Sequence, residues 1–429
     1  MPKPLLGGLA LASLALGLAC TSTKHDPPAS VRIVHASPDA PAVDVYAGDA
    51  SLVKGAAYKA ATSFSQVPSG NLTFKVDPAG TTTPVLTATA MLQPKGYYTV
   101  LAVGNLASIQ ALVVPEEATA PDAGKVKVRV VHAAPAAPEV DVYVTAPGAD
   151  LAGATPAVAG AAFKAFSGAL QVPAATYQIR IAAAGTQTVV YDSGPLPLAA
   201  GSDLVLAAVQ QDLGPSPVTL LALSRDPAHP VTEIPDNRAL VRAVHASPDA
   251  PAVDVVVNGQ TALTGVTYPQ ASAYLPVPQG AATVQLNLAG TSTAVINAPA
   301  TLVAPNAFSI FAVNQVAGLQ LLAVADDLTP PPAGKAKLRA LHLSPDAPAV
   351  DVWVNGAKVL SNVAFKGASA YLQVPAGATS VQIAVAGTTN IVLQSSPDLA
   401  AGGIYTAAAI GTLSAVPSAP LTLDLIRDK

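Results

Sequence analysis

The chain of 429 residues is long enough for several domains, at roughly 100–150 residues each. It carries 22 Lys and Arg against 26 Asp and Glu. Its formal net charge of −4 comes without any run of basic residues, which excludes nucleic acid and anionic lipid as electrostatic partners. The 40 Pro and 31 Gly mark frequent turns and argue against long helices.

The N-terminus has the pattern of an export signal. Lys3 supplies a positive charge, and residues 5–19 form an apolar stretch. The stretch is too short to span a membrane, which takes about 20 residues, but it fits the apolar core of a signal peptide. It ends in Leu16-Gly17-Leu18-Ala19-Cys20, which resembles the bacterial lipobox, although Leu is usual in place of Gly17. The resemblance implies a signal peptide over residues 1–19 and a lipidated Cys20 behind it.

Cys20 is also the only cysteine of the chain. Because a lone cysteine cannot form an internal disulfide, we favour lipidation over an ordinary signal peptide cut nearby, which would leave a free thiol. Thr21 follows it rather than Asp, which by resemblance to enterobacterial sorting implies the outer membrane. We therefore expect a lipid anchor in the cell envelope, periplasmic or surface-facing, with a tether over residues 20–30.

Beyond the tether, one sequence opening occurs four times. It reads V-R-x-x-H-x-S-P-D-A-P-x-V-D-V in its fullest form, and a Val-Pro pair and an Ala-Gly-Thr turn follow it in register. The copies predict four domains, called here units 1 to 4, over residues 31–118, 125–224, 238–328 and 335–429. Unit 2 is longer by eight residues, which fall within residues 145–160. Because the linkers are rich in Pro, we expect separate units in a partly extended line.

Within each unit the apolar runs are short and bounded by turn residues. Val126, Val128, Val130 and His132, for example, alternate with Lys127, Arg129 and Val131, which is the period of a β-strand with one inward face. Six to eight such strands in about 95 residues predict an all-β fold, a tandem array of four β-sandwiches of immunoglobulin-like size. A propeller with two blades per unit is the alternative for repeated β units.

The repeat resembles a bacterial family of domains of unknown function that is common in exported and surface proteins. The V-R-x-x-H-x-S-P-D-A-P-x-V-D-V opening carries this resemblance, together with the Val-Pro pair and the Ala-Gly-Thr turn. Unit 2 departs from it, with Ala134 and Ala136 where the other units have Ser and Asp. The resemblance implies a β-sandwich outside the cytoplasm and supplies neither a substrate nor catalytic residues.

A His and an Asp nine residues later recur in every unit. The pairs are His35 and Asp44, His132 and Asp141, His245 and Asp254, and His342 and Asp351. Such side chains can bind a divalent metal or orient a nucleophile. The spacing is diagnostic of neither, and each His shares its phase with inward Val residues. We therefore favour a packing role, with an Asp of a neighbouring strand or a backbone carbonyl as hydrogen-bond partner.

Three aromatic residues share the phase of the Asp, opposite the inward Val: Tyr46, Tyr143 and Trp353. In a two-layer sandwich this phase faces water, so these rings are candidates for a ligand-binding stripe. Ser37 lies in a Ser-Pro-Asp turn without the neighbours of a catalytic serine.

The sequence therefore predicts no enzyme and no cofactor. We expect a surface-displayed protein with a structural, adhesive or ligand-binding role. Its partner would be a polysaccharide or another envelope component, since repeated units gain avidity on a repetitive ligand. The alternative function is an envelope metal-binding protein or hydrolase that uses the repeated His/Asp pairs.

Overall fold

The computed structural model describes residues 26–211, 214–414 and 416–429. The fold is all-β, as predicted: the described residues form strands β1 to β36 and two short 3-10 turns. No helix among them is long and apolar enough to cross a bilayer. Cys20, the signal peptide and most of the tether lie outside the described residues.

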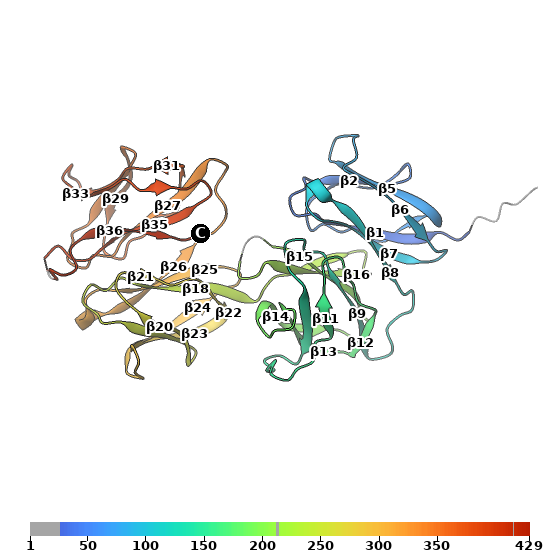
Figure 1. The fold of residues 1–429 in the computed structure, drawn as a ribbon, viewed down its shortest axis with the longest axis horizontal. Helices are drawn as coiled ribbons and strands as arrows, with labels where there is room; N and C mark the ends of the chain where they lie inside the picture. Colours follow the sequence, from blue (N-terminus) through green and yellow to red (C-terminus); the bar gives the residue numbers. More distant parts are fainter. Residues whose placement is uncertain (1–25, 212–213, 415) are drawn as a thin grey trace, which may run out of the picture.

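Units 1 and 2 are each a sandwich of two sheets (Figure 1). In unit 1 the sheets have the strand orders β4-β1-β7-β8 and β3-β2-β5-β6, and in unit 2 β12-β9-β15-β16-β17 and β11-β10-β13-β14. The elements of unit 1 are β1 (Ala29–Ala36), β2 (Val43–Ala47), β3 (Ala50–Ala56), β4 (Ser65–Val67), β5 (Gly70–Pro78), β6 (Leu86–Leu92), β7 (Tyr97–Val103), η1 (Leu106–Ser108) and β8 (Gln110–Glu116). Those of unit 2 are β9 (Lys125–His132), β10 (Val140–Thr145), β11 (Val158–Ala161), β12 (Leu170–Pro173), β13 (Ala175–Ala183), β14 (Val189–Leu198), β15 (Asp203–Gln210), β16 (Val218–Ser224) and β17 (Val231–Ile234).

Units 3 and 4 repeat this arrangement with the sheets β21-β18-β25-β26, β20-β19-β23-β24, β30-β27-β35-β36 and β29-β28-β32-β33, and β22 also pairs with β18. The elements of unit 3 are β18 (Arg238–His245), β19 (Val253–Val257), β20 (Gln260–Val266), β21 (Gln270–Ala271), β22 (Leu275–Pro278), β23 (Gly280–Leu288), β24 (Ala294–Leu302), β25 (Ala307–Val313), η2 (Val316–Gly318) and β26 (Gln320–Asp326). Those of unit 4 are β27 (Lys335–His342), β28 (Val350–Val354), β29 (Ala357–Val363), β30 (Leu372–Pro375), β31 (Gly377–Ala378), β32 (Val381–Val385), β33 (Ile391–Ser395), β34 (Asp398–Leu399), β35 (Ile404–Ile410) and β36 (Thr422–Arg427).

The predicted inward phase of the first strand forms the core of each sandwich. Val126, Val128 and Val130 of β9 pack in the core of unit 2. The other face of β9 is buried as well, because Val131 is 0% and Lys127 only 4% exposed. Alternation along a strand indicates two faces but does not show what covers the second one.

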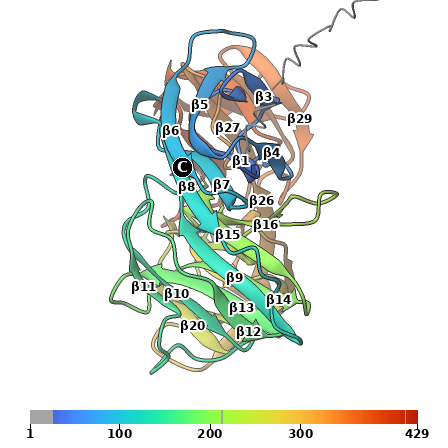
Figure 2. The ribbon, with the colours of Figure 1, turned by 90° about the vertical axis from the view of Figure 1, so that its right-hand side faces the viewer.

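The second face is covered by the neighbouring unit, so the expectation of four separate units in a line is wrong. One apolar cluster joins Val34 and Leu101 of unit 1 to Val131 and Leu221 of unit 2. A second cluster joins units 3 and 4 in the same way, through residues such as Phe311 and Leu343. Units 1 and 2 therefore form one four-layered pair, and units 3 and 4 form another, as Figures 1 and 2 show.

In the second pair, each unit has one buried arginine that forms an ion pair with the other unit. Arg242 of unit 3 donates to the carboxylate of Asp428 in unit 4, and Arg339 of unit 4 donates to Asp326 in unit 3. Each of the four side chains is at most 2% exposed. Each unit supplies an Arg and an Asp at equivalent positions, and each Arg pairs with the Asp of the other unit. Units 3 and 4 are therefore related by an approximate two-fold axis.

The first pair uses the same positions with different charges. Arg32 of unit 1 donates to Glu116 of its own unit at 2.9 Å and to the carbonyl of Ser224 in unit 2 at 2.7 Å. By strand register, Arg225 occupies in unit 2 the place that Glu116 occupies in unit 1. Unit 2 therefore has a cation at the position where each unit of the second pair has its buried Asp.

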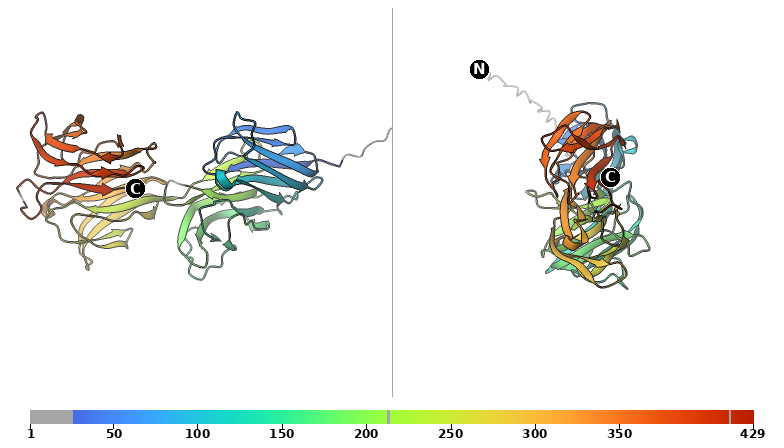
Figure 3. Two further views of the ribbon diagram at one scale, coloured as in Figure 1. Left: turned by 45° about the horizontal axis from the view of Figure 1, so that its top comes forward. Right: turned by 90° about the vertical axis from the view of Figure 1, so that its left-hand side faces the viewer.

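The two pairs are joined through a short segment between β17 and β18 (Figure 3). The linker expected over residues 225–237 is partly a strand, because β17 adds to the sheet of unit 2. Arg238 donates to the carbonyls of Val189 at 3.1 Å and Val190 at 2.9 Å, and pairs with Asp236 at 2.6 Å. These bonds fix the start of unit 3 against unit 2.

Candidate functional site

The repeated His closes the first strand of each unit. Its Nε2 lies 3.0–3.1 Å from the carbonyl oxygen of the Pro six residues later, and since a carbonyl only accepts, Nε2 carries the proton. In three units Nδ1 accepts the amide N–H two residues on, at 3.3–3.4 Å. Burial lowers the pKa of all four His below the usual value. Each His is thus a neutral ring that holds the turn after the first strand, which is Ser-Pro-Asp in units 1, 3 and 4 and Ala-Pro-Ala in unit 2.

The repeated Asp joins two turns of the other sheet. Asp44 accepts the amide of Gly55 at 2.7 Å with one oxygen and that of Gly80 at 3.3 Å with the other. Asp141, Asp254 and Asp351 make the same two bonds in their units. The turns need left-handed backbone, with φ of +63° at Gly55 and +77° at Gly80, which glycine adopts without strain. Throughout the described residues, no hydrogen bond or ion pair joins a repeated His to its Asp.

The Asp of the Ser-Pro-Asp turn has a further structural contact. Asp39 accepts the amide of Leu106 at 2.6 Å, and Asp249 accepts that of Val316 at 2.7 Å, which caps the 3-10 turns η1 and η2. Asp346 accepts the amide of Leu413 at 2.8 Å in unit 4. These partners are 67 residues away in sequence, so the motif fixes the end of the sandwich as well as its own turn.

The three aromatic residues of the proposed stripe have different environments. Tyr143 is only 4% exposed, because Leu151 of the unit 2 insertion packs over it, so the expectation that it faces water is wrong. Tyr46 and Trp353 are half-buried on the outer sheets of units 1 and 4. The ring of Trp353 lies 5.1 Å from Nζ of Lys358, which also bonds Asp351 at 2.7 Å and holds the pKa of that carboxyl at about 2.

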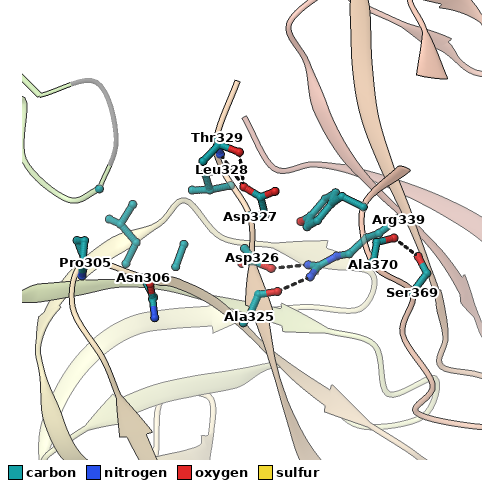
Figure 4. A pocket seen from close by; sticks show the side chains of 14 residues that line it. Pro305, Asn306, Ala325, Asp326, Asp327, Leu328, Thr329, Arg339, Ser369 and Ala370 are labelled. Atoms are coloured by element: carbon teal, nitrogen blue, oxygen red, sulfur yellow. Dashed lines mark hydrogen bonds and ion pairs between the residues drawn. The ribbon is translucent and has the colours of Figure 1, made fainter. Parts of the chain in front are cut away.

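A cavity of about 620 Å³ lies at the boundary of units 3 and 4 (Figure 4). Pro305 and Asn306 form one wall, Asp327 just after β26 another, and Arg339 and Tyr371 of unit 4 the third. Its charged groups already have partners: Arg339 bonds Asp326 and the carbonyl of Ala325, and Asp327 pairs with Lys337 at 2.6 Å. The charged side chains that line the cavity are therefore already paired with other protein groups.

No group of three or more His, Cys, Asp or Glu side chains is placed to hold a metal ion in the part of the chain that the structure describes. The buried arginines are functional residues that were not predicted from the sequence. Arg32, Arg129, Arg242 and Arg339 stand at the same place of every opening, and this repetition is the signal, although an Arg in a strand is by residue type more often exposed than buried.

The sandwiches, the His that holds a turn and the Asp that joins two turns define a tandem β-sandwich repeat protein. The chain belongs to the family described as Domain of unknown function (DUF4397), whose model matches residues 29–143, 239–353 and 336–429. The first two matches run through one unit into the first two strands of the next. Residues 144–238, most of the divergent unit 2, lie outside the matches.

No curated protein sequence matches the chain. Among solved structures it is similar to the Bacillus anthracis TIE protein, with 12% identity and a TM-score of 0.17 over 85% of this chain and 65% of that one. It is also similar to a structure described as alpha-glucan recognition by family 41 carbohydrate-binding modules from streptococcal virulence factors, with 16% identity and a TM-score of 0.16 over 40% and 93%. The chain thus spans about two thirds of the length of the TIE protein.

Proposed function

We propose that this chain is a cell-envelope lipoprotein without catalytic activity, in which two pairs of β-sandwiches form a structural or ligand-binding body on a lipid anchor at Cys20. One observation carries the non-catalytic part. In every unit the repeated His and Asp are bound to main-chain groups, the His to a carbonyl and the Asp to two amides. Side chains held in this way maintain turns and leave no nucleophile–base pair among the repeated groups.

The anchor is supported by the sequence pattern that ends at Cys20. Changing Cys20→Ser should release the protein from membranes into the soluble envelope fraction, because a lipidated N-terminus would be the attachment. Changing Thr21→Asp is the matched control, since it keeps the lipid and should move the protein from the outer to the inner membrane. Fractionation of a Cys20→Ser strain that matches wild type would contradict the anchor.

For the ligand we propose a repetitive envelope polysaccharide, supported by the tandem units and by the half-buried rings of Tyr46 and Trp353 on two outer sheets. The test is co-sedimentation of the purified chain with insoluble cell-wall polysaccharide. The double variant Tyr46→Ala with Trp353→Ala should bind several-fold more weakly. The control is Phe166→Ala, which removes a ring that is 44% exposed elsewhere in unit 2. Equal binding by all three proteins would refute the role of this face.

A further inference from the structure

Unit 1 differs from the other units beside its repeated Asp. Strand β5 places Asp77 directly opposite Asp44 of β2 in the antiparallel register. Directly opposite residues point to the same face of a sheet, with Cβ atoms about 5 Å apart. The outer sheet of unit 1 therefore holds two carboxylates side by side.

Both carboxylates are withdrawn from water, since each residue is 7% exposed. The oxygens of Asp44 accept the amides of Gly55 and Gly80. Oδ1 of Asp77 is completely buried and has no hydrogen-bond partner. Among the described residues, neither carboxylate forms an ion pair with Lys or Arg. A buried acceptor without a partner is unfavourable, and a neighbouring like charge makes it more so.

The other three units avoid this arrangement at the same register positions. The residue opposite the repeated Asp is Ala182 in unit 2, Asn287 in unit 3 and Ala384 in unit 4. Unit 4 also supplies a cation, because Lys358 pairs with Asp351 at 2.7 Å. The position of Lys358 is taken by Ser51 in unit 1. Lys75 lies on the same face opposite Tyr46, but its side chain is exposed and no ion pair joins it to Asp44 or Asp77 among the described residues.

We propose that unit 1 binds one hard divalent cation, of the calcium type, between Asp44 and Asp77, and that the other three units do not. Carboxylate oxygens are the preferred ligands of such ions, which complete their coordination with main-chain carbonyls and water. The bound cation removes the repulsion between the two carboxylates and gives Oδ1 of Asp77 a partner. Neither residue supplies nitrogen or sulfur, the donors that zinc favours.

The test uses Tb³⁺ as the probe on the full mature chain. Tyr46 lies two residues beyond Asp44 on the same face, so it should sensitise Tb³⁺ luminescence. We expect saturable binding of one ion per chain, competed by Ca²⁺, and a higher melting temperature in Ca²⁺ than in chelator. Asp77→Asn should abolish both effects. This variant copies the Asp254–Asn287 arrangement of unit 3, so it is expected to fold.

A variant that adds a second site tests the proposal in the opposite direction. Asn287→Asp recreates the acid pair in unit 3 and should raise the stoichiometry to two ions per chain. Absence of saturable binding in the wild type would overturn the proposal, as would binding that survives in Asp77→Asn. An Asp77→Asn variant that is more stable than wild type, with neither protein responding to Ca²⁺, would also overturn the proposal.

Discussion

The replacement Asp428→Asn tests whether units 3 and 4 are one structural body. Asp428 has a fully buried side chain that accepts from Arg242 of the other unit and from Thr406 and Tyr371 of its own. The amide keeps the volume but removes the charge, and it leaves the Arg242 guanidinium, 2% exposed, without a counter-ion. Loss of one member of a buried ion pair costs about 3–5 kcal/mol. With a urea m-value of about 3 kcal/mol/M, the unfolding midpoint should fall by roughly 1–1.7 M.

Trp353 makes the measurement specific, because it is the only tryptophan of the chain and lies in unit 4. Its fluorescence during urea unfolding of the full chain therefore reports the second pair. Asp327→Asn is the matched control: its carboxylate also binds a cation, but it is 50% exposed, so the expected loss is at most about 1 kcal/mol. A Trp353 transition in Asp428→Asn within about 0.5 kcal/mol of wild type would show that the pair interface contributes no stability, and would refute the reasoning.

Three further variants follow from the same geometry. His342→Ala should cost about 1–3 kcal/mol at pH 7.5. Because burial lowers the pKa of His342 below 6.5, the unfolded chain takes up a proton first as the pH falls, so this cost should shrink towards pH 5; urea titrations at both pH values check it. Asp254→Asn, which weakens a bond to the amide of Gly290, should lower the melting temperature of the second pair by several degrees in calorimetry, and an unchanged melt would contradict its bridging role. Leu343→Ala should cost about 2–5 kcal/mol and speed amide hydrogen exchange in both units 3 and 4, whereas faster exchange in unit 4 alone would argue against a shared core.

The sequence is sufficient to predict the sandwich but not the pair. The alternation of Val126, Val128 and Val130 identifies one strand face, and the fourfold repeat predicts four copies of one unit. The partner of the other face follows from no local pattern. Arg129 and Lys127 in that face indicate a solvated surface by residue type, and only the position of the neighbouring unit shows that they are buried.

The candidate site shows the same limit. Phase predicted that each repeated His is inward, and a backbone carbonyl was one of the two partners expected. Tyr143 has the same phase as Tyr46, yet it is buried, because the unit 2 insertion folds back over it. The equivalence of Asp77 with Asn287 depends on the pairing of β5 and β23 with their neighbours, and strand register cannot be derived from composition or period.

An unpaired fifth unit in this chain would have an apolar sheet face without a cover. Its residues equivalent to Val131 or Leu343 would lie in water, and such a surface favours aggregation. The pair, and not the single unit, is therefore the smallest part of this chain in which every apolar sheet face is covered. Within each pair, the two halves are then free to diverge in complementary ways, as Glu116 and Arg225 have done at equivalent positions.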